Sequence, residues 1–525
     1  MGGPKGCKTM GTHRRPKSAD LGGLHLATGS EDQGHGWLGD GIDLQTPFAE
    51  LLSDMYNESV LTLNEPEDDL TAWADIPRCA RERFICSLDS WNFEPHRLTD
   101  TEVLQCCMLL FEGLYSMDGM AEVVGVPLDQ LYPFIRHLRR IYRLENCYHN
   151  FRHALDVLQA SYSFLRSAGV VPSLSILFQS NRRWRTDRTG SLVASLDLSD
   201  IFLIYVAAIG HDVGHPGFTN VFMKNAQTPL SVVFSNRSAL EQMHCSLLLR
   251  IMRHHGLGRL LLRPDARKLL WETVMATDMS VHADFMARFQ SMLSGEEMPT
   301  HLRKILVAQA IMKCADISNP CRPYHVSQHW ATRLMKEWHC QASFEKQLSL
   351  PTTVQSSEDA LSEAKGQLFF NATFARPLFE LTIKAIPDMQ MYGTQCISNF
   401  LRWQERKANL EKSKPVLRDY SVVVDSNGDF GNAFRLTLPA DYCGSDVASS
   451  GSDSDEGESV ASSTLAPSTV GSDATLAREE RHAAIRGAAG KALRKQKSIA
   501  NRNSWSPMGV LAVPALPSHN KDPTL

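Results

Sequence analysis

The chain has 525 residues, of which 43% are hydrophobic and 21% charged, and its formal net charge is −4 at pH 7. This composition is typical of a soluble protein with a sizeable core, and the lack of a basic excess argues against a nucleic-acid partner. No apolar run is long enough to span a bilayer. The 12 cysteines show no CxxC pair and no regular spacing, which favours free thiols in a cytoplasmic protein.

Composition divides the chain into a central region and its flanks. Residues 1–43, rich in Gly and basic residues, predict a disordered arm, and residues 44–74 form a leader segment. Residues 75–420 carry most of the histidines and long apolar runs, and predict one large domain. A short appended segment, 421–442, precedes the Ser-rich residues 443–525. That last stretch has too few apolar side chains to order itself, so a disordered tail is expected.

The central region is predicted to be helical almost throughout. The first strong pattern covers residues 131–145, whose apolar positions recur at the spacing of one helix face. These positions are Leu131, Phe134, Ile135, Leu138, Ile141 and Tyr142. Further along, the apolar run 201–210, closed by Asp200 and His211, predicts a buried helix.

Another helix start is predicted at residue 238. Ser238 and Glu241 fit a capping box, in which two side chains satisfy the free backbone amides of a helix start, and the helix would run through Ile251. Only residues 420–424 hint at a strand. The expected fold class is therefore an all-α domain, with many helices around one deep site.

Histidines and acidic residues recur along these predicted helices. His149 and His153 lie four residues apart, a spacing that places two imidazoles on one helix face. His211, Asp212 and His215 follow the buried apolar run directly. Later in the chain come Glu241, His244, Thr277, Asp278 and Asp316.

This set of side chains suits a pair of divalent metal ions. Imidazoles and carboxylates together favour zinc at one position and magnesium or manganese at another. A carboxylate can bridge two such ions, which would lie about 3.5–4 Å apart and share a hydroxide able to attack phosphorus. Each residue also has an ordinary explanation: a helical histidine is usually a core or surface residue, and Glu241 or Asp316 can simply cap a helix or turn. Together those explanations would leave several buried ionisable groups without partners, which is costly.

The same residues fall within motifs that resemble those of class I cyclic-nucleotide phosphodiesterases. The longest runs from His211 to Phe222 and reads His-Asp-Val-Gly-His-Pro-Gly-Phe-Thr-Asn-Val-Phe. The others follow in the family's order: Tyr148-His149-Asn150 with His153, Leu240-Glu241 with His244, Ala276–Met279, Ala315–Pro320, and Gln367 with Phe370. The resemblance covers about residues 80–410, and the form of the longest motif is most similar to the fungal high-affinity cAMP branch.

The resemblance implies a helical catalytic domain of the His-Asp metal phosphohydrolase type. It would hydrolyse a 3′,5′-cyclic nucleotide, cAMP in preference to cGMP, to the 5′-monophosphate, and so end a cAMP signal. His149 would be the general acid that protonates the departing 3′-oxygen. The tighter ion, expected to be zinc, would be held by His153, His211, Asp212 and Asp316. Asp212 would also reach the second ion, expected to be magnesium or manganese, whose water shell would be held by His215, Glu241, His244, Thr277 and Asp278.

The resemblance also places the purine pocket. The amide of Gln367 can pair with a purine edge, and Phe370, three residues on, can stack on the base. Taken alone, however, a helical Gln is usually solvated and a Phe is usually core. Leu334, counted from Asn319, would form the opposite wall, and both belong to the implied substrate-binding set.

Three positions depart from the family pattern. They are Gly214, Met243 and Phe369, where many relatives have Asp, His and Gly. None is a direct metal ligand in the family, so these departures bear on metal preference and pocket shape rather than on the class of reaction.

Two other functions stay open. A His-Asp metal phosphohydrolase acting on nucleoside mono- or triphosphates would share the ligands but lack the Gln-x-x-Phe slot and the Tyr-His-Asn acid. A metal-binding scaffold with decayed activity would have no need of His149. In the flanks, Ser18 follows Arg14-Arg15-Pro16-Lys17, and Ser498 follows Lys495-Gln-Lys. Both resemble sites read by cAMP-dependent kinases, so a kinase is a candidate partner; merely solvated basic stretches are the alternative.

Overall fold

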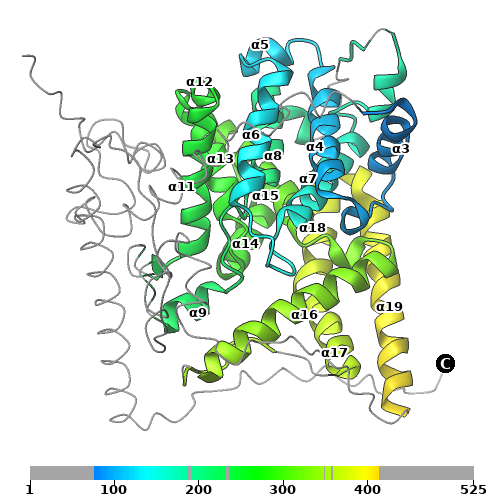
Figure 1. Ribbon diagram of the computed structural model, residues 1–525, viewed down its shortest axis with the longest axis vertical. Helices are drawn as coiled ribbons and strands as arrows, with labels where there is room; N and C mark the ends of the chain where they lie inside the picture. The colour runs from blue at the N-terminus through cyan, green and yellow to red at the C-terminus, as the bar shows by residue number, and fades with distance from the viewer. Residues whose placement is uncertain are drawn as a thin grey trace, which may run out of the picture. The chain divides into compact units, whose positions relative to one another are not determined.

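The computed structural model describes a helical part of the chain. The described residues are 76–180, 182–185, 192–226, 228, 230–231, 234, 236–347, 349–355 and 359–412. Within them no β-sheet forms, and Met117 and Trp184 make an isolated β-bridge. The all-α prediction is therefore confirmed (Figure 1). The predicted arm, leader and tail, together with the strand hint at 420–424, lie outside the described residues.

The helices are joined by loops of varied length, several of which contain short 3₁₀ segments. In chain order the described α-helices of five or more residues are α3 Arg78–Asp89, α4 Asp100–Tyr115, α5 Met120–Val124, α6 Leu131–Ile141, α7 Phe151–Ser167, α8 Leu198–Gly210, α9 Asn220–Asn225, α11 Ala239–His254, α13 Pro264–Met275, α14 His282–Leu293, α15 Thr300–Asp316, α16 Tyr324–Gln347, α17 Ala360–Phe370, α18 Arg376–Ala385 and α19 Gln390–Lys412. Across this described part, no helix combines the length and apolar character that a membrane span requires.

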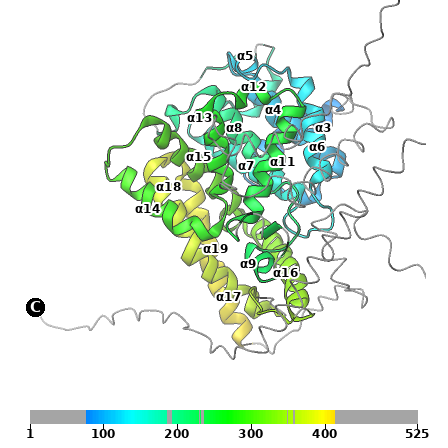
Figure 2. The ribbon, with the colours of Figure 1, turned by 90° about the vertical axis from the view of Figure 1, so that its left-hand side faces the viewer.

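Helix α8 lies at the centre of the core. Every residue from Ser199 to Gly210 is buried, and α8 contacts α7, α13 and α15 (Figures 1 and 2). A helix that is apolar all round must be covered on every side, which is why the run 201–210 is surrounded by other helices. Its start is fixed by a capping box between Asp197 and Asp200. The prediction of a buried helix here is confirmed.

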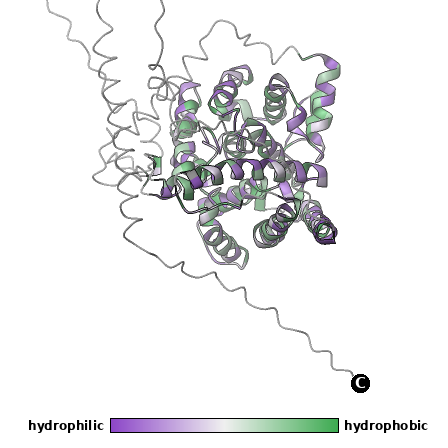
Figure 3. Cartoon of the chain, turned by 60° about the horizontal axis from the view of Figure 1, so that its bottom comes forward, coloured by the Kyte–Doolittle hydropathy of each residue, from purple (hydrophilic) through white to green (hydrophobic). Residues whose placement is uncertain are grey.

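The surrounding helices are amphipathic, with hydrophobic and hydrophilic residues mixed along each one (Figure 3). Helix α6 buries five of the six predicted apolar positions and ends at Ile141, four residues earlier than the pattern 131–145 indicated. Tyr142 has an extended backbone, because its hydroxyl donates to the carbonyl of Ile209 and accepts from the amide of Asp212, both at 3.1 Å. These bonds direct the following residues into the loop that leads to His149.

Candidate active site

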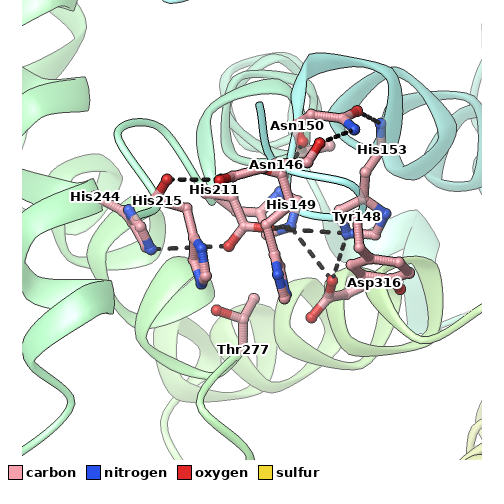
Figure 4. A network of polar contacts seen from close by, with 12 residues as sticks. Asn146, Tyr148, His149, Asn150, His153, His211, His215, His244, Thr277 and Asp316 are labelled. Atoms are coloured by element: carbon pink, nitrogen blue, oxygen red, sulfur yellow. Dashed lines mark hydrogen bonds and ion pairs between the residues drawn. The ribbon is translucent and has the colours of Figure 1, made fainter. Parts of the chain in front are cut away.

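The predicted site residues come from helix ends and loops that meet beside α8. His211 and Asp212 directly follow the last residue of α8, and Asp316 is the last residue of α15. His153 lies in the first turn of α7, which is capped by Asn150. Figure 4 shows the side chains of His153, His211 and Asp316 converging on one small region. A helix end suits such a site because its side chains can point into a shared space while the helix body is anchored in the core.

The closest group consists of two imidazoles and two carboxylates. Asp316 Oδ1 lies 3.3 Å from Nε2 of both His153 and His211. Asp212 Oδ2 lies 3.2 Å from His211 Nε2 and 3.8 Å from His153 Nε2. Both histidines are almost completely buried. Four sequence-predicted ligands, distant in the chain, are thus brought together.

The donor atoms of this group fit a bound cation. Nδ1 of His211 lies 3.0 Å from the carbonyl oxygen of Ala208. Because a carbonyl can only accept a hydrogen bond, Nδ1 carries the proton and Nε2 of the neutral ring has a lone pair. That lone pair faces carboxylate oxygens, and both His211 Nε2 and Asp212 Oδ2 are buried without a hydrogen-bond partner. Burial opposes a charged imidazole, yet Asp212 and Asp316 raise the pKa of His211 well above its usual range. The two carboxylates therefore favour a positive charge between them and the imidazoles, which a divalent metal would provide.

Asp212 also faces a second group of histidines. Its Oδ1 lies 3.8 Å from Nε2 of His244, while Nδ1 of His244 donates to the carbonyl of Val213 at 2.8 Å. Asp212, His215 and His244 bring one polar side-chain atom each within 4.8 Å of one another. Asp212 thus belongs to both groups, as expected of a carboxylate that reaches two ions.

His215 differs from these histidines in its tautomer. Its Nδ1 accepts a hydrogen bond from the backbone amide of Gly217 at 3.0 Å, so the proton of the neutral ring lies on Nε2. Burial and the neighbouring His149 lower the pKa of His215 well below its usual range, which keeps it neutral. In this state His215 Nε2 can donate to a water or phosphate oxygen rather than bind a metal.

His149 is not on the helix that carries His153. The prediction of a shared helix face was wrong, because α7 begins only at Phe151 and His149 lies in the loop before it. Its ring stacks instead on that of His215, with centroids 4.0 Å apart and planes 18° apart. Nδ1 of His149 donates a short hydrogen bond to Oε1 of the buried Glu337.

Glu337, which the sequence did not predict, contacts the His149 loop. Besides the imidazole, it accepts the backbone amides of Tyr148 at 2.9 Å and His149 at 3.1 Å. Burial opposes the imidazolium, but the Glu337 carboxylate outweighs it and raises the pKa of His149 to about 9. A signal was present, since Trp330, Leu334 and Glu337 recur at helical spacing on α16. Nothing in the sequence, however, indicated which helix would face His149.

Two of the residues predicted near a second ion, Glu241 and Asp278, form a buried acidic pair. Asn220 Nδ2 donates to both oxygens of Glu241, at 3.2 and 2.8 Å. Burial and the nearby Asp278 raise the pKa of Glu241 to about 8. Thr277 donates to the carbonyl of Val274 at 2.8 Å, and Figure 4 places it beside the histidine cluster.

The capping box predicted at Ser238 was wrong. Ser238 has φ of 43° and makes no side-chain cap. Its hydroxyl donates instead to Asp278 Oδ2 at 2.7 Å, and Glu241 is occupied by Asn220. The side chains of Ser238 and Glu241 thus bond to Asp278 and Asn220, and neither caps the start of helix α11.

The predicted pocket residues lie on three elements. Leu334 packs against a buried cluster of Tyr148, Val326 and Trp330. Asn319 donates to the hydroxyl of Tyr148 at 2.5 Å, so its amide supports the Tyr-His-Asn loop. Gln367 and Phe370 lie in the last turns of α17, as predicted, and are partly exposed.

The departures from the family pattern occupy two places. Gly214 has φ of +78°, and a Cβ there would lie 2.8 Å from Leu247 Cδ1 and 3.7 Å from Met243 Cε. Gly214 and Met243 are therefore neighbours, and an apolar contact stands where many relatives have two polar side chains. Phe369, on α17, is 64% exposed and its ring lies 6.1 Å from that of Phe374.

The helical fold, with buried His and Asp groups at its helix ends, is suited to a metal-binding domain. Comparison with known proteins then gives the family. Residues 148–396 match the family described as 3′5′-cyclic nucleotide phosphodiesterase. This part of the chain is therefore a class I 3′,5′-cyclic-nucleotide phosphodiesterase domain.

Individual relatives are similar at a moderate level. The chain is 27% identical to the probable 3′,5′-cyclic-AMP phosphodiesterase pde-4 of Caenorhabditis elegans, over 62% of this chain and 48% of the relative. It is 28% identical to the human high affinity cGMP-specific 3′,5′-cyclic phosphodiesterase 9A, over 65% of this chain and 52% of the relative. A crystal structure of yeast caPDE2 in complex with IBMX has a TM-score of 0.54 at 27% identity, covering 68% of this chain and 73% of that one. The chain spans about half or less of the length of the curated relatives that it matches.

Proposed function

We propose that this protein hydrolyses 3′,5′-cyclic nucleotides, cAMP in preference to cGMP, to their 5′-monophosphates and so ends a cAMP signal. The observation that carries this proposal is the pairing of two features. One is the buried His and Asp cluster in which His211 Nε2 and Asp212 Oδ2 lack hydrogen-bond partners. The other is the His149–Glu337 pair beside it. Together they supply a place for cations and a proton donor, which phosphodiester cleavage requires.

The metal roles follow from the donor atoms. His153, His211, Asp212 and Asp316 would hold the first ion, which we take to be zinc because imidazole nitrogens make up half of the set. Asp212 would also reach the second ion, magnesium or manganese, which prefers oxygen. When bound, two such ions lower the pKa of water and neutralise charge on a phosphate. In our proposal the water shell of the second ion is held by His215, Glu241, His244, Thr277 and Asp278.

His149 is the proposed proton donor. The Glu337 carboxylate keeps it protonated at neutral pH, since it raises the pKa of His149 to about 9. The Glu337 contact at Nδ1 leaves Nε2–H free to point at the departing 3′-oxygen. General acid catalysis of this kind typically contributes about 10²–10⁴ in rate.

The purine is proposed to lie between α16 and α17. Gln367 would pair with the base edge, Phe370 would stack on its face, and Leu334 would form the other wall, with Asn319 at the phosphate end. The preference for cAMP is supported by the similarity of the His211–Phe222 motif to the fungal high-affinity branch. Relatives named for cAMP and for cGMP match this chain at similar identity, and a direct comparison of the two substrates tests the preference.

The decisive experiment measures products from cAMP, cGMP, AMP and dATP with purified protein and magnesium. We expect 5′-AMP from cAMP, slower conversion of cGMP, and no reaction of AMP or dATP. Conversion of AMP or dATP would instead indicate a nucleotide phosphohydrolase of the same class. Retained metal without turnover of any substrate would indicate a decayed metal-binding scaffold.

The flanking residues are proposed to regulate rather than catalyse. We propose a cytoplasmic enzyme with its catalytic domain at residues 75–420 and kinase sites at Ser18 and Ser498. These serines follow basic residues, and a phosphate would add about −1.5 to −2 charge to either flank.

A further inference from the structure

Asn146 connects the two histidine loops of the active site. It lies between α6 and α7 and is 5% exposed. Its Nδ2 donates to the backbone carbonyl of His149 at 2.8 Å and to that of His215 at 2.8 Å. An Asn amide nitrogen has two donor hydrogens, so both are used on backbone atoms and neither remains for a substrate.

The two carbonyls belong to segments that are otherwise far apart in the chain. Asn146 and His215 are separated by 69 residues, and one segment ends in the proposed acid while the other lines the proposed metal cluster. The imidazoles of His149 and His215 stack at 4.0 Å. A ring stack tolerates sliding, whereas two directed hydrogen bonds from one planar amide do not. Asn146 therefore fixes the position of one loop relative to the other (Figure 4).

The surroundings of Asn146 allow this close approach. Gly217 has φ of +83°, and a Cβ at that position would lie 2.8 Å from Asn146 Oδ1. Only glycine accommodates both the backbone conformation and the contact. On the other side, Asn150 Nδ2 donates to the carbonyl of Asn146 at 2.9 Å, and Asn150 Oδ1 caps α7 at His153. Asn146 is thus held from both sides.

We propose that Asn146 is a positioning residue for the general acid, holding His149 at the distance from the metal cluster that protonation of the 3′-oxygen requires. The proposal rests on the proposed function of His149. Asn146 itself donates to no reacting atom. A displacement of about 1 Å in a catalytic group can lower a rate by about 10²-fold, so Asn146→Ala is expected to lower kcat by about 10- to 100-fold with a smaller change in KM.

The test compares two leaving groups in one protein preparation. One substrate is the cyclic nucleotide, whose 3′-alkoxide needs a proton to leave. The other is its analogue with sulfur in place of the bridging 3′-oxygen, because a thiolate of pKa near 8.5 leaves without one. Both His149→Ala and Asn146→Ala should lose far more rate on the oxygen substrate than on the sulfur analogue. This ratio does not depend on how much of the preparation is folded.

A double-variant comparison gives a second readout. If Asn146 acts through His149, removing both side chains should cost no more than removing His149 alone. Asn146→Asp is the size-matched variant, and its carboxylate would oppose the two carbonyls, so it should be at least as impaired as Asn146→Ala. Asn92→Ala, at an exposed Asn outside the site, is the control and should match the parent.

The outcomes separate the two proposals. Normal turnover of the oxygen substrate by His149→Ala would overturn the acid role of His149 itself. A selective loss in His149→Ala, together with an equal loss on both substrates in Asn146→Ala, would overturn only the positioning role. Additive losses in the double variant would also overturn it, since Asn146 would then act independently of His149.

Discussion

Glu337 lies against the imidazole of His149 from a helix 188 residues further along the chain. Its second oxygen accepts the backbone amides of Tyr148 and His149, so the carboxylate orients both the ring and the loop. This contact sets the pH range in which His149, the proposed acid, keeps its proton. The folded-state pKa of His149 is raised to about 9, so its proton is present at neutral pH and is lost as pH rises through that value.

Replacing Glu337 by Gln should move the alkaline limb of the rate profile. The amide keeps the size of the side chain but removes the negative charge that raises the pKa of His149. The imidazole would then lose its proton at lower pH, so kcat/KM should fall earlier on the alkaline side, and kcat at pH 8 should drop by about tenfold or more. The check is kcat/KM against pH from 6 to 10. An alkaline limb that stays in place would show that another group controls it.

For the proposed metal ligands we predict a loss of both bound metal and turnover. Asp316→Ala or His211→Ala removes one donor of a closed set and leaves the remaining carboxylate or imidazole unbalanced. Both variants should lose zinc and abolish turnover, which metal analysis by mass spectrometry and a cAMP assay measure together. His301→Ala, at an exposed position on α15, is the matched control. Full zinc content with normal turnover in either ligand variant would contradict the assignment.

For the proposed purine pocket we predict an effect on substrate binding rather than on metal content. Gln367→Ala should raise KM and weaken the preference between cAMP and cGMP while zinc content stays unchanged. Losing one buried hydrogen-bonding partner typically costs about 1–3 kcal/mol, which corresponds to about 5- to 150-fold in KM. The comparison is KM for both nucleotides in Gln367→Ala and in Gln404→Ala, an exposed glutamine on α19. Unchanged KM and selectivity would place the base elsewhere.

How far the sequence predicted this site depends on the distance between interacting residues. His211 and Asp212 were predictable because they follow an apolar run that must be buried, and a polar pair at the end of such a helix signals a function. His149 was found from its motif, but its place in a loop was not, because i to i+4 spacing does not show where a helix begins. Glu337 was missed because its partner lies in another part of the chain, where no local pattern connects them.

The two wrong predictions about helix ends, at Ser238 and in α6, have the same physical origin. The capping box at Ser238 satisfied a local rule, yet its hydroxyl donates to Asp278, 40 residues away. Helix α6 was predicted too long because Tyr142 keeps the apolar spacing, while its hydroxyl bonds to the end of α8 terminate the helix. In each case a tertiary hydrogen bond outweighed a local preference worth about 1 kcal/mol.

The flanks give a prediction about regulation. Removing residues 1–43 and 443–525 should leave basal hydrolysis nearly unchanged, since every proposed site residue lies in the range from Asn146 to Phe370. Treatment with a cAMP-dependent kinase should label Ser18 or Ser498 and change the rate of the full chain only. Phosphopeptide mapping and cAMP assays before and after treatment measure this. Labelling without a change in rate would remove the regulatory role and leave the catalytic proposal intact.

The last prediction concerns stability beneath the metal cluster. Asp156, one turn after His153 on α7, pairs with Arg322 at 3.0 Å, and their side chains are 1% and 0% exposed. The guanidinium also donates to Gln159 Oε1 at 2.6 Å and lies 3.8 Å from the ring of Trp91. Removing one partner of a buried ion pair leaves an uncompensated charge, which typically costs about 3–5 kcal/mol.

Arg322→Met should therefore strongly lower the midpoint of thermal and denaturant unfolding. Replacing both partners, as Asp156→Leu with Arg322→Met, should recover much of this loss, because a well-packed apolar pair removes the buried charge altogether. The cycle of parent, two single variants and the double variant isolates the coupling between the two side chains. If the two losses simply add, the pair contributes nothing through its charges, and the effect of Arg322→Met comes from its packing on Trp91 and its bond to Gln159.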